Sequence, residues 1–263
     1  MRIWMAVLVM CAGSLQGAEF RDVLKGAEID GMLSGAIRDQ AVLERPNYAI
    51  WLKVHDGKPG PRETHADADD ILHIRKGKAT VTLGDRRYEV GPGDLVHITR
   101  NTAHQIDPGK GRLDYVVVRI FPTGDNLPAR QGLLAARRMP DLLKKSEIDA
   151  TIEKHDSNQP IHSGKAYTMN YVIYAGHEGP WEAHRGCVDI YFIQRGTARA
   201  QLGGGITNPI EESPGEIRGD GVQGAREYEI GPGDLVHIPR MGTHHMIPKS
   251  PKLSYVLLKI WAE

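Results

Sequence analysis

Four side chains in the first half of the sequence could together hold a divalent metal ion. Glu63 and His65 are two positions apart, so on a β-strand they face the same side. Asp70 begins the next apolar stretch, and His104 follows a later one. Three strands could therefore bring two imidazoles and two carboxylates to one point. A mixed nitrogen and oxygen set suits Mn, Fe, Ni, Zn or Cu, and it indicates metal-dependent chemistry.

The same set occurs a second time along the chain. Its members are Glu182, His184, Asp189 and His244. The first three lie 119 positions after their counterparts, and flanking glycines keep the same displacement. A longer stretch is nearly identical in the two halves, with 12 of 17 positions shared between YEVGPGDLVHITRNTAH at 88–104 and YEIGPGDLVHIPRMGTH at 228–244. The chain is therefore a duplicated domain, and both copies keep the candidate metal ligands.

The length and the repeat divide the chain into two domains. A chain of 263 residues has room for two domains of ordinary size, which we place at 19–136 and 137–263. Apolar and polar residues alternate in segments bounded by glycine-rich turns, a pattern typical of half-buried strands in an antiparallel all-β domain. In the first half these predicted strands are 48–54, 71–74, 79–83 and 113–121.

Two segments lie outside this strand pattern. Residues 127–155 carry leucines at the spacing of an amphipathic helix, interrupted by Pro140, and predict a helical connector between the domains. The two repeated stretches are 140 positions apart rather than 119, so the second copy contains 21 additional residues. These lie within 203–225, a region rich in Gly, Pro and acidic residues. We expect a long loop there, either a lid over a site or a mobile insertion.

The charge composition indicates which partners to expect, and the first residues indicate the cellular compartment. Acidic and basic residues number 33 each, so no strong field favours nucleic acid. Residues 1–18 have Arg2 followed by an apolar run that is too short for a membrane span of about 20 residues. They predict a signal peptide, and hence an exported chain, periplasmic or secreted, with no membrane segment after cleavage. Cleavage leaves Cys187 as the one cysteine, which we interpret as a small buried residue rather than a reactive thiol.

The spacing of the candidate ligands resembles that of the cupin superfamily, whose first motif is G-x5-H-x-H-x(3,4)-E-x6-G and whose second is G-x5-P-x-G-x2-H-x3-N. The corresponding stretches are Gly57-x5-Glu63-x-His65-x4-Asp70-x6-Gly77, its repeat from Gly176 to Gly196, and the segments from Gly93 to His104 and from Gly233 to His244. In two copies the pattern is similar to a tandem bicupin of the type-2 cupin kind. The resemblance implies an all-β fold of two jelly-roll-like (double-stranded β-helix) barrels, each with a metal site in its mouth.

The sequence departs from the family pattern in the ligands themselves. Glu63 and Glu182 stand where the family has its first histidine, and Asp70 and Asp189 stand where it has glutamate. Either these carboxylates are metal donors, or Asp and His only hydrogen-bond each other inside the barrel. Unpaired buried charges are costly, which favours a bound ion. His97 and His237 also match between copies, and we interpret them as structural.

These observations predict an exported bicupin that binds a divalent transition metal and acts on a small organic molecule. The resemblance implies a dioxygenase, decarboxylase or isomerase, and hence a metal-dependent oxidoreductase or lyase. The alternative is a non-catalytic cupin that binds or stores a small molecule. A cupin-type transcription regulator is disfavoured by the signal peptide and by the absence of a helix-turn-helix pattern. We expect the two barrels to pack as a pseudo-dimer, and the whole chain is a candidate for self-association.

Overall fold

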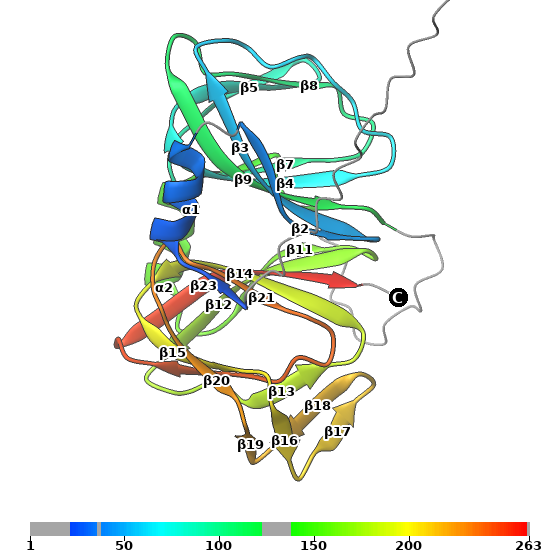
Figure 1. The fold of residues 1–263 in the computed structure, drawn as a ribbon, viewed down its shortest axis with the longest axis vertical. Helices are drawn as coiled ribbons and strands as arrows, with labels where there is room; N and C mark the ends of the chain where they lie inside the picture. The colour runs from blue at the N-terminus through cyan, green and yellow to red at the C-terminus, as the bar shows by residue number, and fades with distance from the viewer. Residues whose placement is uncertain (1–21, 36–37, 123–137, 262–263) are drawn as a thin grey trace, which may run out of the picture.

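The computed structural model describes residues 22–35, 38–122 and 138–261, which form two β-barrels stacked along the long axis of the molecule (Figure 1). The predicted all-β fold is confirmed, because the described residues contain only two helices, both short. Neither of these helices is long and apolar enough to cross a membrane. The predicted signal peptide, residues 1–18, lies outside the described residues.

The N-terminal barrel consists of a six-stranded and a three-stranded sheet, ordered β10-β7-β4-β9-β3-β2 and β6-β5-β8. Its strands are β2 (Asp39–Arg45), β3 (Tyr48–Asp56), β4 (Asp69–Gly77), β5 (Ala79–Leu83), β6 (Arg86–Val90), β7 (Leu95–Ile98), β8 (His104–Asp107), β9 (Arg112–Ile120) and β10 (Leu142–Leu143). The four strands predicted from alternation correspond to β3, β4, β5 and β9. In β5 the alternate residues Ala79, Val81 and Leu83 are buried, as the period of two requires.

The C-terminal barrel repeats this plan with two six-stranded sheets, ordered β1-β21-β14-β23-β12-β11 and β17-β18-β13-β22-β15-β20. Its strands are β1 (Val23–Leu24), β11 (Gln159–Ser163), β12 (Tyr167–Ala175), β13 (Trp181–His184), β14 (Cys187–Arg195), β15 (Ala198–Leu202), β17 (Ile210–Ser213), β18 (Glu216–Gly219), β20 (Arg226–Ile230), β21 (Leu235–Ile238), β22 (His244–Pro248) and β23 (Lys252–Trp261).

Two glycines of the repeated pattern are required by close contact between backbones. Gly77 has φ +83°, and a Cβ atom there would lie 1.8 Å from the carbonyl oxygen of Arg112. Gly196, its counterpart, has φ +76° and would meet the carbonyl oxygen of Lys252 at 2.2 Å. Only glycine fits such a position, which explains why both copies keep it.

The two copies exchange their first strands. β1, at the start of the first copy, pairs with β21 of the C-terminal barrel. β10, at the start of the second copy, pairs with β7 of the N-terminal barrel. A helix follows each exchanged strand, α1 (Gly26–Ser34) after β1 and α2 (Lys145–Lys154) after β10. Each barrel is therefore completed by the other copy, and α1 lies along the junction of the two barrels (Figure 1).

Asp94 and Asp234, from the repeated GPGD turns, hold the exchanged segments. Asp234 accepts a hydrogen bond from the backbone N–H of Gly26, at the start of α1, and pairs with the ammonium group of Lys25. Asp94 accepts from the N–H of Lys145, at the start of α2, at 2.8 Å. Such carboxylates satisfy N–H groups that a helix leaves free at its first turn, and each contributes about 1 kcal/mol. The most similar stretch of the two copies is thus the stretch that docks them together.

The predicted pseudo-dimer is confirmed by the packing between the barrels. One hydrophobic cluster contains residues of both large sheets, among them Ile50 and Val118 from one barrel and Leu258 from the other. Ile148 of α2 is buried in the same cluster.

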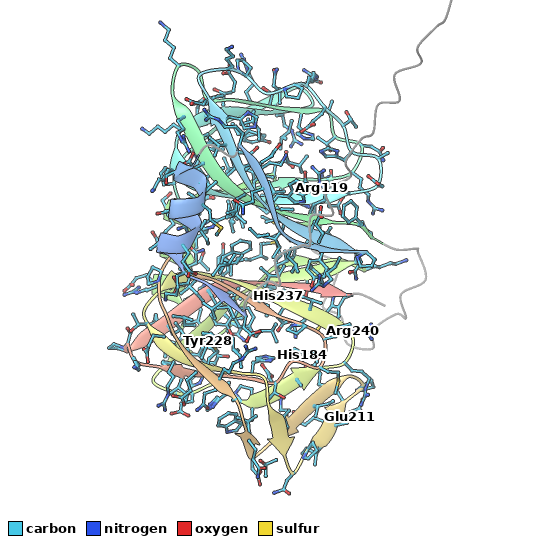
Figure 2. The ribbon with its side chains drawn as sticks, in the orientation of Figure 1. Arg119, His184, Glu211, Tyr228, His237 and Arg240 are labelled. Carbon is cyan, nitrogen blue, oxygen red and sulfur yellow. The ribbon has the colours of Figure 1, made fainter. Side chains whose placement is uncertain are left out.

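Two buried histidines each contact a tyrosine of the other barrel. Nε2 of His97 lies 2.6 Å from the hydroxyl of Tyr167, and Nε2 of His237 lies 2.8 Å from the hydroxyl of Tyr48. These contacts agree with the structural role predicted for both histidines, and Figure 2 shows His237 near the junction.

The connector is helical over a shorter stretch than predicted. Residues 127–137 lie outside the described residues, and the helix there is not tested. Leu142 and Leu143, which we assigned to the amphipathic helix, instead form β10. These residues form backbone hydrogen bonds with the edge of β7 that does not pair with β4, and the helix begins only at Lys145.

The prediction of a long loop within 203–225 is wrong, because most of these residues form short strands. β16 (Gly205–Thr207) pairs with β19 (Gly221–Gln223), and β17 pairs with β18. We call residues 205–223 the insert. It projects from the end of the C-terminal barrel that is farther from the N-terminal barrel (Figure 1). Its strands have three or four residues, and β17 is exposed throughout, so they show no core-forming periodicity. Pairing between the strands selects their conformation instead, and β18 alone among them also pairs with β13.

We predict that the folded chain loses stability between pH 6.5 and pH 4 because of His97 and His237. Burial lowers the pKa of each to about 4, from an ordinary value of 6.5. In this interval the unfolded chain binds more protons than the folded chain, so acid favours unfolding. At about 1.4 kcal/mol for each pKa unit, each histidine costs roughly 3 kcal/mol of unfolding free energy by pH 4.

Urea denaturation between neutral pH and about pH 4 measures this loss. The variant with both His97→Gln and His237→Gln should show a flatter dependence of unfolding free energy on pH than the wild type. His177→Gln, at an exposed position, is the control and should retain the wild-type dependence. Parallel curves for the wild type and the double variant would contradict the assignment.

Candidate metal centres

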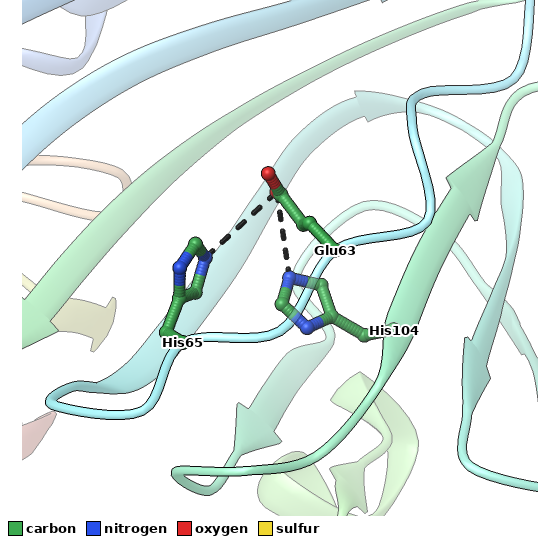
Figure 3. Close-up of side chains that lie close together, drawn as sticks. All are labelled: Glu63, His65 and His104. Atoms are coloured by element: carbon green, nitrogen blue, oxygen red, sulfur yellow. Dashed lines mark ion pairs between the residues drawn. The ribbon is translucent and has the colours of Figure 1, made fainter.

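Three of the four predicted ligands converge in the N-terminal barrel. Glu63, His65 and His104 each offer a donor atom, and these atoms all lie within 4.8 Å of one another. Nε2 of His104 lies 3.5 Å from Oε1 of Glu63, and Nε2 of His65 lies 3.8 Å from the same oxygen (Figure 3). Such separations allow one ion to bind between the three residues.

Backbone contacts position these side chains. Glu63 and His104 form a β-bridge, with the N–H of Glu63 donating to the carbonyl of His104 at 3.0 Å. Asn101, in a left-handed turn with φ +61°, donates its N–H to the carbonyl of His65. Nδ1 of His104 lies 3.0 Å from the carbonyl of Thr102. That contact makes Nδ1 the protonated nitrogen, so the free Nε2 faces the cluster.

The fourth predicted ligand, Asp70, is paired with Arg119, a cation that we did not predict to lie at the site. Arg119, inside the upper barrel in Figure 2, donates two hydrogen bonds of 2.8 Å to the two oxygens of Asp70. The same guanidinium lies 2.7 Å from Nε2 of His65. An arginine only donates, so the imidazole accepts with the lone pair that a metal would need. Burial, and then the positive charge of Arg119, lower the pKa of His65.

The C-terminal barrel brings the corresponding residues together and buries them more deeply. Glu182, His184 and His244 again have donor atoms within 4.8 Å of one another. Nε2 of His244 lies 3.2 Å from Oε1 of Glu182, and Oδ2 of Asp189 lies 3.4 Å from Nε2 of His184. The side chain of His184 is 6% exposed, against 20% for that of His65. The second centre is therefore better shielded from water.

A lysine takes the place of the arginine in this barrel. Nζ of Lys259 lies 3.8 Å from Oδ1 of Asp189, on the side of the carboxylate away from His184. Burial, the largest single effect, would lower the pKa of Lys259, but the charges of Asp189 and of the further acidic groups around it together raise that pKa. Burial alone would raise the pKa of Asp189, but the charges of Lys259 and His184 hold that pKa well below its usual range. The carboxylate is thus ionised, and the lysine leaves the imidazole accessible.

His184 also contacts a carboxylate of the insert. Nδ1 of His184 lies 2.7 Å from Oε2 of Glu216, on β18. Burial alone would lower the pKa of His184, but contacts with Asp189 and Glu216 raise it to about 9. Without a metal ion the imidazole is therefore charged at neutral pH, and a metal would displace the proton on Nε2.

One buried atom shows that the C-terminal set fits a metal ion. Nε2 of His244 is shielded from solvent and has no hydrogen-bond partner among the described residues, although Glu182 is close. Its Nδ1 contacts the carbonyl of Gly242 at 3.1 Å, which leaves the Nε2 lone pair facing Glu182 and His184. A buried polar atom without a partner is rare in folded proteins. Two imidazoles beside carboxylates are a usual donor set for transition metals.

The two barrel interiors differ in how they are filled. The N-terminal barrel contains a cavity of about 160 Å³ beside Glu63, His104 and Arg119. Three residues lining it have bulkier counterparts in the hydrophobic cluster of the C-terminal barrel: His55, Leu72 and Val117 correspond to Tyr174, Tyr191 and Leu257. Smaller side chains at these three positions therefore leave room for the cavity of the first barrel.

Comparisons with known proteins agree with this architecture. Residues 50–118 match the family model of the cupin domain. The chain shares its fold with a cupin 2 conserved barrel domain protein from Leptotrichia buccalis, at 10% identity and TM-score 0.64, covering 94% of this chain and 100% of that one. Residues 50–118 are therefore a cupin domain by sequence, and the chain as a whole has the fold of cupin proteins.

Two further structures share the fold of this chain. A salicylate 1,2-dioxygenase from Pseudaminobacter salicylatoxidans has 9% identity and TM-score 0.65, with 90% of this chain and 83% of that chain covered. A putative glyoxylate induced protein from Pseudomonas aeruginosa has 13% identity and TM-score 0.59, with 92% and 91% covered. No curated protein matches this chain in sequence. At such low identities, the TM-scores show a shared fold and nothing further.

The sequence did contain a signal for the two cations that we did not predict. Arg119 and Lys259 occupy matching positions in the apolar strands β9 and β23. A basic residue kept in both copies of an apolar strand indicates a buried partner of opposite charge. Cys187, by contrast, is where we expected it, buried at the start of β14.

We predict that exchanging these two cations exchanges the metal-binding properties of the barrels. Arg119→Lys should free Nε2 of His65 and give the N-terminal set a measurable metal affinity. Lys259→Arg should place a fork-shaped donor beside His184 and weaken binding in the C-terminal set. Titration of each purified variant with Co²⁺, followed by absorption spectroscopy, counts the sites. Unchanged site numbers in both variants would show that the cations do not control metal binding.

Proposed function

We propose that this cupin binds one divalent transition metal ion in its C-terminal barrel and uses it to act on a small organic molecule, as an oxidoreductase or a lyase. The observation that supports this most is the buried Nε2 of His244, which faces Glu182 and His184 without a hydrogen-bond partner among the described residues. In the N-terminal barrel Arg119 donates to Nε2 of His65, the counterpart of His184. That hydrogen bond uses the lone pair that a metal ion would need.

Each residue of the C-terminal set has a definite role in this proposal. Glu182, His184 and His244 would hold the ion, and Asp189 would stay paired with Lys259 as a nearby negative charge. A bound metal supplies a Lewis acid for a carbonyl or enolate oxygen, or activates dioxygen if it is iron. The side chain of Glu182 is 17% exposed, so a small molecule would approach from this side.

The second candidate is non-catalytic binding of a small molecule in the N-terminal barrel. It is supported by the cavity of about 160 Å³ and by the Arg119–Asp70 pair, which neutralises the buried carboxylate without a metal. In that case the cavity would take a small polar molecule, and metal would not be needed for its binding.

Metal analysis of the full chain, purified without a metal-affinity tag, tests the proposal. We expect about one equivalent of metal in the wild type, lost in His184→Ala and in His244→Ala because each removes a donor. His65→Ala and His104→Ala are the matched controls in the other barrel and should retain it. Sub-stoichiometric metal that His184→Ala leaves unchanged would contradict the proposal.

Substrates can then be sought with the loaded protein. The chain shares its fold with a salicylate 1,2-dioxygenase, one structure of which contains gentisate. Salicylate and gentisate are therefore the first compounds to test under dioxygen. Binding of a small molecule that requires no metal and survives His184→Ala would favour the non-catalytic alternative.

We also propose that the chain is exported. Arg2, the apolar run after it and the small residues Gly17 and Ala18 support a cleaved signal peptide. Sequencing the N-terminus of the protein isolated from cell fractions tests this. We expect a chain that begins near Glu19 outside the cytoplasm, and an uncleaved chain retained in the cytoplasm would contradict export.

A further inference from the structure

The insert is the largest difference between the two copies, and it lies directly against the metal-ligand strand. β18 pairs antiparallel with β13, in a register that places Glu216 opposite His184 and Arg218 opposite Glu182. Two successive same-face positions of the insert strand therefore face two of the three proposed ligands. Side chains directly opposite each other on antiparallel strands lie on the same face and interact.

Both facing pairs make contacts of opposite charge. Oε2 of Glu216 lies 2.7 Å from Nδ1 of His184. The guanidinium of Arg218 lies 3.6 Å from Oε2 of Glu182, which leaves Oε1 of that carboxylate beside His244. Each contact uses the atom of the ligand that faces away from the metal-binding cluster. The insert thus contacts the ligands from outside without competing for their donor atoms.

A carboxylate on Nδ1 determines how an imidazole presents Nε2. A proton held on Nδ1 by the carboxylate leaves the Nε2 lone pair for the metal, fixes the ring orientation and raises the basicity of the ligand. Loss of such a partner commonly weakens metal binding by about 10- to 100-fold. Glu216 is in the position that this role requires.

The N-terminal barrel has no equivalent of β18 among its described strands. In that barrel Glu63 pairs only with His104, through one β-bridge. The C-terminal barrel has the same pairing between Glu182 and His244. The side chain of Glu63 is 46% exposed, against 17% for that of Glu182. The insert therefore accounts for the greater burial of the C-terminal ligands as well as for the contact with His184.

We infer that Glu216 is a positioning residue that orients His184 for metal binding, so that the insert makes the C-terminal barrel the high-affinity metal site of the chain. This inference rests on the proposed function, because it assumes that the C-terminal set binds metal. It assigns to the insert a role in preparing the ligands rather than in covering the site as a lid.

Co²⁺ affinity and the Co²⁺ absorption spectrum of the full chain test this inference. We expect Glu216→Ala to bind Co²⁺ about 10- to 100-fold more weakly than the wild type, with shifted absorption bands because the imidazole is no longer fixed. Glu216→Gln should be intermediate, since its amide oxygen keeps an acceptor beside Nδ1 but loses the charge. Glu211→Gln removes a carboxylate from the same insert that contacts Gly215 and Arg185 but no ligand, and it should match the wild type.

The outcomes separate this inference from the function on which it rests. If the wild type binds no Co²⁺, or if His184→Ala binds it as well as the wild type, the proposed function fails. If the wild type binds and His184→Ala does not, wild-type affinity and spectrum in both Glu216 variants would overturn the positioning role alone. Should Glu216→Ala fail to fold without metal, as judged by circular dichroism, the Glu216→Gln variant decides the question.

Discussion

The architecture of the chain depends on the carboxylates of Asp94 and Asp234. Each closes its own turn by accepting from a glycine N–H and also accepts from the first N–H of a helix that belongs to the other copy. Because the exchanged helix and strand are consecutive, fixing the helix also fixes the strand that completes the neighbouring sheet. A local pair of hydrogen bonds thereby holds two barrels together, and the buried His–Tyr contacts between the barrels form under the same constraint.

Charge burial is the second constraint, and it separates the two interiors. Each barrel contains an aspartate that is nearly inaccessible to water, and such a carboxylate needs a cation nearby. Arg119 satisfies Asp70 through a fork that also reaches His65. Lys259 is a point charge on one side of Asp189 and leaves His184 to other partners. A guanidinium and an ammonium of equal charge therefore produce different sites, because only the guanidinium spans two acceptors.

Much of this could be predicted from the sequence, because the pattern was local or repeated. The duplication, the main strands and the meeting of Glu63 with His65 and His104 follow from spacing alone. The exchange of β1 and β10 does not, since two nearly identical GPGD turns are equally able to hold the helix of their own copy or that of the other. The insert strands were missed for a related reason. Their conformation is selected by pairing with one another and, for β18, with β13, a strand far away in sequence, and not by their own alternation.

The exchange and the metal centre are connected through one sheet. β1, from the start of the chain, forms the edge beside β21, and β21 pairs with β14 so that Ile238 lies opposite Asp189. The strand that carries this aspartate is therefore supported by a segment of the first copy, while the strand that carries Glu182 and His184 is supported by the insert of the second. Neither support comes from the short stretch that contains the ligands. The C-terminal centre is thus a property of the whole chain, and a C-terminal barrel expressed without residues 22–35 would lack part of the sheet that holds Asp189 in place.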